Sequence, residues 1–150
     1  MTAAARRRFD HSGLQILDDD ESLRLLSSVQ VGRLVFTRGG LPVVRLVNFA
    51  LDGRSLLFAT ADGDKYRAAE RGDVVAFEAD EVDLDRHLGW TVTATGHLSA
   101  VDSDELPDNP PVRPWAPDRE RHLIRLTIEL LEGRRLLAWG QRPHAEGSNA

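Results

Sequence analysis

The sequence contains no cysteine and only one tyrosine and one methionine among its 150 residues. The absence of cysteine excludes disulfide bridges, thiolate metal sites and cysteine nucleophiles. No apolar run is long enough to cross a bilayer, and no apolar segment of signal-peptide length follows the arginines at positions 6–8. We therefore expect a cytoplasmic protein that does not bind a membrane.

The sequence also lacks the common catalytic motifs and any concentration of basic residues. It has no G-x-G-x-x-G, G-x-x-x-x-G-K-[ST], H-E-x-x-H or G-x-S-x-G. The formal net charge of −5 argues against nucleic acid as a partner, because such a role needs a basic face. The five histidines have no metal-ligand spacing, so we interpret them as structural or surface residues and expect no metal site.

The length and the pattern of short apolar segments predict one mainly β domain. We assign residues 1–13 to a disordered tail, residues 14–139 to the domain and residues 140–150 to a polar tail. Six or seven strands joined by tight turns favour an antiparallel barrel, with one short helix near residue 22 and another near residue 68. We interpret Glu132-Gly133 as a turn between the last two strands.

The stretch from residue 41 to residue 71 carries the strongest functional signal. Residues 43–51 form an apolar strand interrupted by Arg45 and Asn48, which alternation places on opposite faces. Asp52-Gly53 predicts a hairpin turn into a return strand over residues 55–60. A polar turn then opens a helix over residues 65–71 that ends at Gly72.

This stretch predicts a site for an anion such as a phosphate. Free N–H groups at the helix start, with Thr60 before them and Lys65 and Arg67 in the first turns, would attract negative charge. The alternative interpretation is that both basic residues are ordinary solvated helix residues and that Arg45 pairs with a nearby acid.

Several segments resemble the pyridoxamine 5′-phosphate oxidase-like family of FMN-binding split barrels. The match lies in the order and spacing of residues 31–36, Pro42, residues 47–53, Thr60 with Gly63 and Lys65, residues 75–78, Gly89-Trp90 with the following strand, Pro114-Trp115, Arg125 and residues 133–135. The resemblance implies a split barrel, a homodimer with the flavin at its interface, and an oxidoreductase acting on a small molecule.

The resemblance also implies cofactor-binding residues. Arg45 and Lys65 would hold the FMN phosphate, and Thr60 would add a hydroxyl. The ring would lie against Arg45, Leu46, Val47 and Asn48, with Trp90 or Thr91 approaching from a neighbouring strand. Residues near Trp115 or Arg135 would come from the second subunit.

The end of the chain departs from the pattern of the true oxidases. Residues 134–143 do not align with the arginine- and tryptophan-containing motif that grips the pyridoxal substrate in those enzymes. We therefore expect no vitamin B6 activity, and no catalytic residue can be named. Two alternatives to FMN stay open: a deazaflavin, whose longer anionic tail would need a basic groove near Arg67 and Arg71, and a non-catalytic protein that binds flavin or haem.

Overall fold

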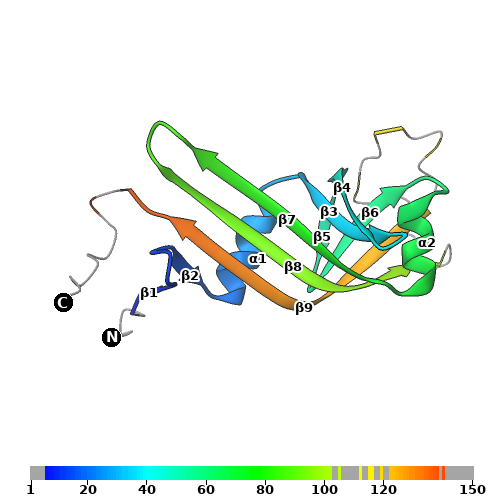
Figure 1. Cartoon of the computed structure of the whole chain (residues 1–150), viewed down its shortest axis with the longest axis horizontal. Coiled ribbons are helices and arrows are strands. Elements are labelled where there is room, and N and C mark those ends of the chain that lie inside the picture. Colours follow the sequence, from blue (N-terminus) through cyan, green and yellow to red (C-terminus); the bar gives the residue numbers. More distant parts are fainter. Residues whose placement is uncertain are drawn as a thin grey trace.

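The computed structural model describes residues 6–102, 105, 112, 115–116, 119, 122–138 and 140. This part of the chain is mainly antiparallel β structure with two helices, α1 (Asp19–Ser27) and α2 (Asp64–Arg71), as the sequence predicts (Figure 1). The described strands are β1 (Arg8–Phe9), β2 (Gln15–Leu17), β3 (Val31–Arg38), β4 (Leu41–Asn48), β5 (Ala50–Asp52), β6 (Ser55–Thr60), β7 (Val74–Asp83), β8 (Leu88–Ala100) and β9 (His122–Leu136). None of the helices in the described part is long and apolar enough to cross a membrane.

The strands form one sheet that curls into a barrel without closing. Strand β9 pairs with β8 on one edge; on its other edge it pairs first with β6 and then with β2. From β8 the sheet continues through β7 and β3 to β4. Strands β4 and β6 approach each other but do not pair in the described sheet, so the barrel is split between them. The predicted split barrel is therefore confirmed.

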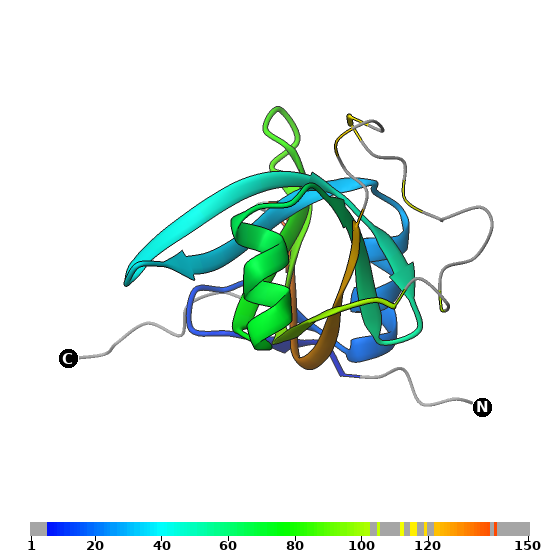
Figure 2. The same cartoon turned by 90° about the vertical axis from the view of Figure 1, so that its right-hand side faces the viewer.

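Helix α2 lies at one end of this split. Figure 2 shows the helix at the end of the barrel with the β3–β4 hairpin curving over it. The helix follows β6 after a short turn and stops at Gly72, whose φ of 70° is the left-handed conformation expected at a helix end. Its C-terminus and the β5–β6 hairpin, which pairs Asp52 with Ser55, lie where the sequence predicts them.

Much of the core comes from alternation along the strands, although β6 buries the consecutive residues Leu56, Leu57 and Phe58. Three aromatic rings meet at its centre: Phe77 lies 4.7 Å from Phe49 and 5.5 Å from Phe58 between ring centroids. On β8, Trp90, Val92, Ala94 and Leu98 point inward and Thr91, Thr93 and Thr95 lie on the other face, as predicted. The buried side chains leave the split lined by the edges of β4 and β6.

The structure differs from the prediction at the start of the domain. Arg8 and Phe9 form β1, which pairs with β2, so regular structure begins before the predicted boundary at residue 14. Residues 141–150 of the predicted polar tail lie outside the described residues. The described part of the chain has nine strands, because β1, β2 and the short β5 are separate strands.

The predicted turn at Glu132-Gly133 is wrong, because both residues lie inside the continuous strand β9. Gly133 is needed there for a close approach and not for a turn. A Cβ atom at this position would lie 2.2 Å from the Ser22 hydroxyl oxygen of α1. The glycine therefore lets α1 pack directly on β9.

Candidate functional site

Arg45 lies on β4, at one edge of the split. The guanidinium donates a hydrogen bond to the neighbouring Val44 carbonyl, 3.1 Å away. In residues 14–102 and 122–138, every arginine other than Arg45 has a described carboxylate within 4 Å. Within the described residues, the expected alternative of an acid partner for Arg45 is therefore not realised.

Thr60 and Lys65 lie on the opposite side of the split. Thr60 ends β6 with its side chain buried, and its hydroxyl donates to the Ala61 carbonyl at 3.2 Å. Lys65 lies in the first turn of α2 and is half-buried. At 100° per residue it falls on the same side of the helix as the buried Ala68 and Ala69, which is the side packed against the barrel.

The start of α2 carries no side-chain cap. Gly63 occupies the N-cap position, and no side chain there accepts a hydrogen bond from the first-turn N–H groups. Such N–H groups, together with the positive end of the helix dipole, favour a bound anion. We call Arg45, Thr60, Lys65 and this helix start the phosphate corner, after the ligand that the sequence analysis predicts for them.

Asp64 adjoins the phosphate corner, and its negative charge is compensated within the protein. Arg38 of β3 donates to one carboxylate oxygen at 2.9 Å, and Arg67 donates to the other at 3.3 Å. The hydrogen bond from Arg38, followed by that from Arg67, lowers the pKa of Asp64. Two guanidinium groups therefore surround one carboxylate, and the carboxylate does not make this corner negative.

A histidine that the sequence analysis treated as structural or surface lies beside the phosphate corner. His122 is directly opposite Thr60 in the β6–β9 pairing. Its Nε2 lies 2.5 Å from the Asp62 carboxylate, and its ring stacks on Tyr66 at 4.0 Å between centroids. Because Asp62 and His122 are 60 residues apart, local spacing could not reveal this contact. The contact fixes the turn that joins Thr60 to Lys65.

The residues expected to line the flavin ring are divided between the two faces of the sheet. Val47 and Trp90 are buried in the core, whereas Leu46 is exposed on the outer face. Thr91 also points outward, so Trp90 and Thr91 cannot both approach one ligand with their side chains. Asn48 lines a cavity of about 520 Å³ between α1 and β5.

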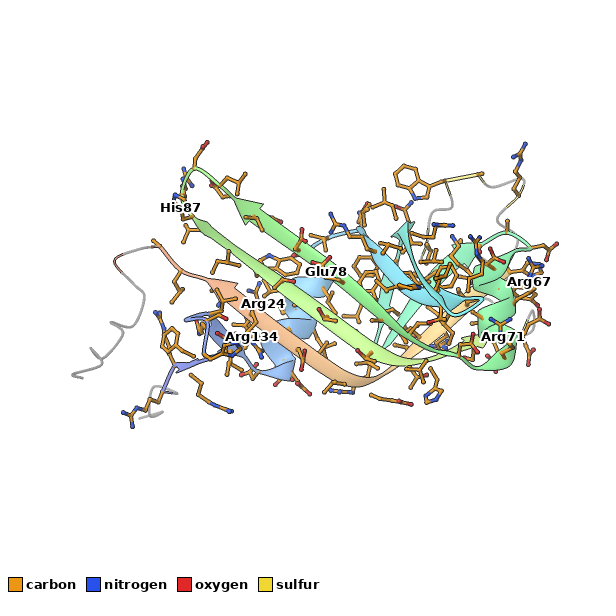
Figure 3. The ribbon with its side chains drawn as sticks, in the orientation of Figure 1. Arg24, Arg67, Arg71, Glu78, His87 and Arg134 are labelled. Atoms are coloured by element: carbon orange, nitrogen blue, oxygen red, sulfur yellow. The ribbon has the colours of Figure 1, made fainter. Side chains whose placement is uncertain are left out.

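Polar side chains form a connected cluster on the outer face beside Leu46. Arg33, directly opposite Leu46 in the β3–β4 pairing, lies 3.0 Å from Glu78 and 3.2 Å from Asp80. The Thr91 hydroxyl donates to Glu78 at 3.2 Å. Burial, followed by the nearby Asp80 carboxyl, raises the pKa of Glu78, which lies in the middle of the sheet (Figure 3).

Comparison with known proteins places this geometry in a family. The family model described as pyridoxamine 5′-phosphate oxidase matches residues 18–135, which include the barrel and the phosphate corner. The chain belongs to the pyridoxamine 5′-phosphate oxidase family. The resemblance predicted from the sequence is therefore confirmed.

Three similar proteins cover most of this chain. The uncharacterized protein Rv0080 of Mycobacterium tuberculosis is 35% identical over 95% of this chain and 100% of its own length. The solved structure of an FAD-binding protein from Mycobacterium smegmatis is 30% identical, with a TM-score of 0.64, over 83% of this chain and 99% of that one. A conserved protein of unknown function from Corynebacterium diphtheriae has the same identity and coverage and a TM-score of 0.67.

Family membership does not assign a role to each side chain. Arg45, Leu46, Val47, Asn48, Thr60, Lys65, Trp90 and Thr91 stay predicted cofactor-binding residues. Arg135, expected near the second subunit's site, lies 2.7 Å from Glu21 of α1 in its own chain. Of these residues, Arg45 and Thr60 lie on the two strands that border the split, and Lys65 lies in the first turn of α2.

Proposed function

We propose that this protein is a flavoprotein that binds a flavin nucleotide in the split of the barrel, with the phosphate held by Arg45, Thr60 and Lys65. FMN is the smallest such cofactor. The flavin would supply electron transfer to or from a small organic substrate, and the protein would bind, orient and shield it. The observation that carries the proposal is the Arg45 guanidinium at the split without a described carboxylate partner.

The surroundings of the split meet three demands of a flavin nucleotide. The phosphate needs cations and N–H donors, which Arg45, Lys65 and the uncapped start of α2 provide. The polar edge of the ring needs backbone groups, which β4 offers because it is the last strand of the described sheet. The apolar side of the ring needs an apolar surface, and the exposed Val44 and Leu46 lie on the same strand.

The proposal includes a homodimer in which the second subunit covers the flavin. Val31, Val44 and Leu46 lie on the outer face of β3 and β4, and each exposes more than a third of its surface. Adjacent exposed apolar side chains of this kind are typical of a surface that another protein covers. Trp115, 63% exposed, adds a large apolar ring that a partner could cover.

The proposal is tested by titrating the purified protein with FMN, FAD and riboflavin, followed by flavin fluorescence and thermal stabilisation. We expect FMN and FAD to bind. Riboflavin should bind at least tenfold more weakly, because it lacks a phosphate and forfeits charge-assisted hydrogen bonds worth about 1.5–3 kcal/mol each. Absence of binding by every flavin, or equal binding of riboflavin and FMN, would contradict the proposal.

The visible spectrum of the freshly purified protein separates flavin from the alternatives of deazaflavin and haem, because the three absorb differently. Electron transfer is tested by anaerobic addition of NADH or NADPH to the flavin-loaded protein. Loss of the oxidised flavin absorbance supports an oxidoreductase. An unchanged spectrum with both donors favours flavin binding without turnover.

A further inference from the structure

The hairpin that joins β7 to β8 projects past β3 (Figure 1), and we call its residues 81–87 the hairpin tip. Figure 3 labels His87 at the end of this hairpin. The Asp83 carboxylate accepts hydrogen bonds from the backbone N–H groups of Asp85 and Arg86, each 3.1 Å away, and His87 closes the turn with a left-handed φ of 52°. Because these contacts already fix the turn, the hairpin tip loses little conformational entropy when a partner binds it.

The hairpin tip presents apolar side chains to solvent. Leu84 is 78% exposed, a larger fraction than the 69% of Leu41 at the β3–β4 turn, and Val82 is 46% exposed. Both residues line a surface cavity of about 640 Å³, which Trp90, itself buried, also lines. Exposed apolar side chains on a fixed, projecting turn are typical of a surface that another protein covers.

The hairpin tip also carries an excess of negative charge. Glu81, Asp83 and Asp85 line its cavity, and no described basic residue lies among the lining residues. Arg86 lies 3.8 Å from Asp83 and compensates only one of the three carboxylates. A partner that fits this surface therefore offers cations around an apolar contact for Leu84.

A cavity of about 260 Å³, which we call the basic cleft, lies beside β1 and β2 at the same end of the molecule as the hairpin tip (Figure 1). Four arginines line it, at positions 6–8 and 135, together with the half-buried Ile16. Its two carboxylates have partners in their own chain: Asp18 accepts the Glu21 N–H at 2.8 Å, and Glu21 lies 2.7 Å from Arg135. The arginines at positions 6–8 have no described carboxylate within 4 Å, so the basic cleft has the charge and the apolar contact that the hairpin tip needs.

The positions of the hairpin tip and the basic cleft suit a closed pair of chains. They adjoin neighbouring strands, because Trp90 of β8 pairs with Arg135 of β9. A two-fold axis at this end would bring each hairpin tip to the other chain's basic cleft, so both contacts form in one dimer. The dimer face proposed above reaches the same end: β3 is antiparallel to β7 and pairs Arg33 with Glu78, so Val31 lies at the end of β3 nearest the hairpin tip. One axis can therefore serve both surfaces.

We propose that the hairpin tip docks into the basic cleft of a second copy of this chain, with Leu84 entering the cleft and Glu81 and Asp85 facing the arginines at positions 6–8. The inference rests on the homodimer of the proposed function and does not depend on the flavin. Exposed ion pairs are screened by salt, so the contact weakens as ionic strength rises.

The experiment uses the absence of cysteine, which allows a single thiol to be placed on each surface. Leu84→Cys and Arg7→Cys proteins are mixed, left to exchange subunits and treated with a short bismaleimide cross-linker. We expect a covalent dimer that contains one copy of each variant, identified by its mass. Leu41→Cys is the matched control, because Leu41 is an exposed leucine at the β3–β4 turn, at the opposite end of β3 from Val31. It should give no covalent dimer with Arg7→Cys.

Sedimentation velocity then measures the strength of the contact. We expect Leu84→Lys, which places a cation against the arginines of the basic cleft, to weaken dimerisation at least fivefold, with Leu41→Lys within twofold of the wild type. A dimeric wild type that gives no mixed covalent dimer, or gives as much with Leu41→Cys, would overturn the inference and leave the β3–β4 interface and the flavin in place. A monomeric wild type would overturn the inference together with the proposed homodimer. A mixed covalent dimer from a protein that binds no flavin would support the inference and contradict the flavin proposal alone.

Discussion

Glu78 and Glu21 are two glutamates whose surroundings shift their pKa values in opposite directions. Burial and the neighbouring Asp80 raise the pKa of Glu78 on the outer face of the sheet. Hydrogen bonds from Arg24 and Arg135 lower the pKa of Glu21, at the start of α1, to about 2. Ionisation is therefore unfavourable to folding at Glu78 and favourable at Glu21.

We predict opposite pH dependences for Glu78→Gln and Glu21→Gln. The folded-state pKa of Glu78 is raised, so the stability conferred by its protonated form is complete below about pH 4.5 and is lost as pH rises through the folded-state pKa. Glu78→Gln should therefore be at least as stable as the wild type at pH 7, with this advantage disappearing by pH 4. The measurement is the free energy of unfolding in urea at pH 7 and pH 4.

The pH dependence of stability is reversed at Glu21. Its contribution is present above about pH 4.5 and is lost as pH falls towards 2, so Glu21→Gln should be less stable than the wild type at pH 7 and equal to it near pH 2. A Glu78→Gln protein that is clearly less stable at pH 7 would show that the Arg33 ion pair outweighs the cost of burying the carboxylate.

At the scale of elements, the turn between β6 and α2 depends on a contact with the distant strand β9. His122 bonds Asp62 and stacks on Tyr66, on either side of Gly63. The ring stack contributes about 0.5–1.5 kcal/mol, and the contact between His122 and Asp62 adds to it. Together they hold the turn in the conformation that presents Thr60 and Lys65.

We therefore predict that His122→Ala weakens flavin binding about fivefold, which corresponds to roughly 1 kcal/mol. The matched control is His97→Ala, because His97 forms a similar exposed pair with Glu129, 2.6 Å apart, without any contact to this turn. Its flavin dissociation constant should stay within twofold of the wild type. Equal effects of the two substitutions on flavin titrations would contradict a positioning role for His122.

Local sequence signals predicted the elements that depend on neighbouring residues. The Asp52-Gly53 hairpin, the end of α2 at Gly72 and the alternation of β8 all follow from short-range chemistry. Gly133 was misread because the same residue type serves both turns and close approaches, and its partner Ser22 is far away in the sequence. The His122–Asp62 contact escaped prediction for the same reason.

At the scale of the whole molecule, the split barrel leaves apolar side chains exposed on the outer face of β3 and β4. We predict that the protein is a dimer and that Leu46→Glu shifts it towards the monomer, because the new carboxylate would lose its hydration in the interface. Leu41→Glu is the control. Leu41 is exposed on the same strand at the β3–β4 turn, and alternation along the strand places it on the opposite face from Leu46. Sedimentation velocity that finds a monomeric wild type, or the same shift for both variants, would contradict the proposed interface.

The sequence could place Arg45 on a strand and Lys65 on the helix after the hairpin, but it could not show how the folded chain distributes charge around them. That Arg45 lacks a described carboxylate partner, while Asp64 is bound by Arg38 and Arg67, depends on β3, β4 and α2 meeting at the split. The predicted ring-lining residues were taken from the family resemblance. Alternation already placed Arg45 and Asn48 on opposite faces, and the structure adds which face is the core, because Val47 is buried and Leu46 is exposed.

The most direct measurement of the central claim is the flavin dissociation constant of Arg45→Gln compared with the wild type and with Arg54→Gln. Arg45→Gln removes the available guanidinium from the split while keeping a polar side chain, and the control removes an exposed arginine that pairs with Asp19 elsewhere. We predict that Arg45→Gln binds FMN and FAD at least tenfold more weakly, with riboflavin binding unchanged and the control equal to the wild type. Wild-type affinity of Arg45→Gln for both nucleotides would show that the phosphate does not lie in the split.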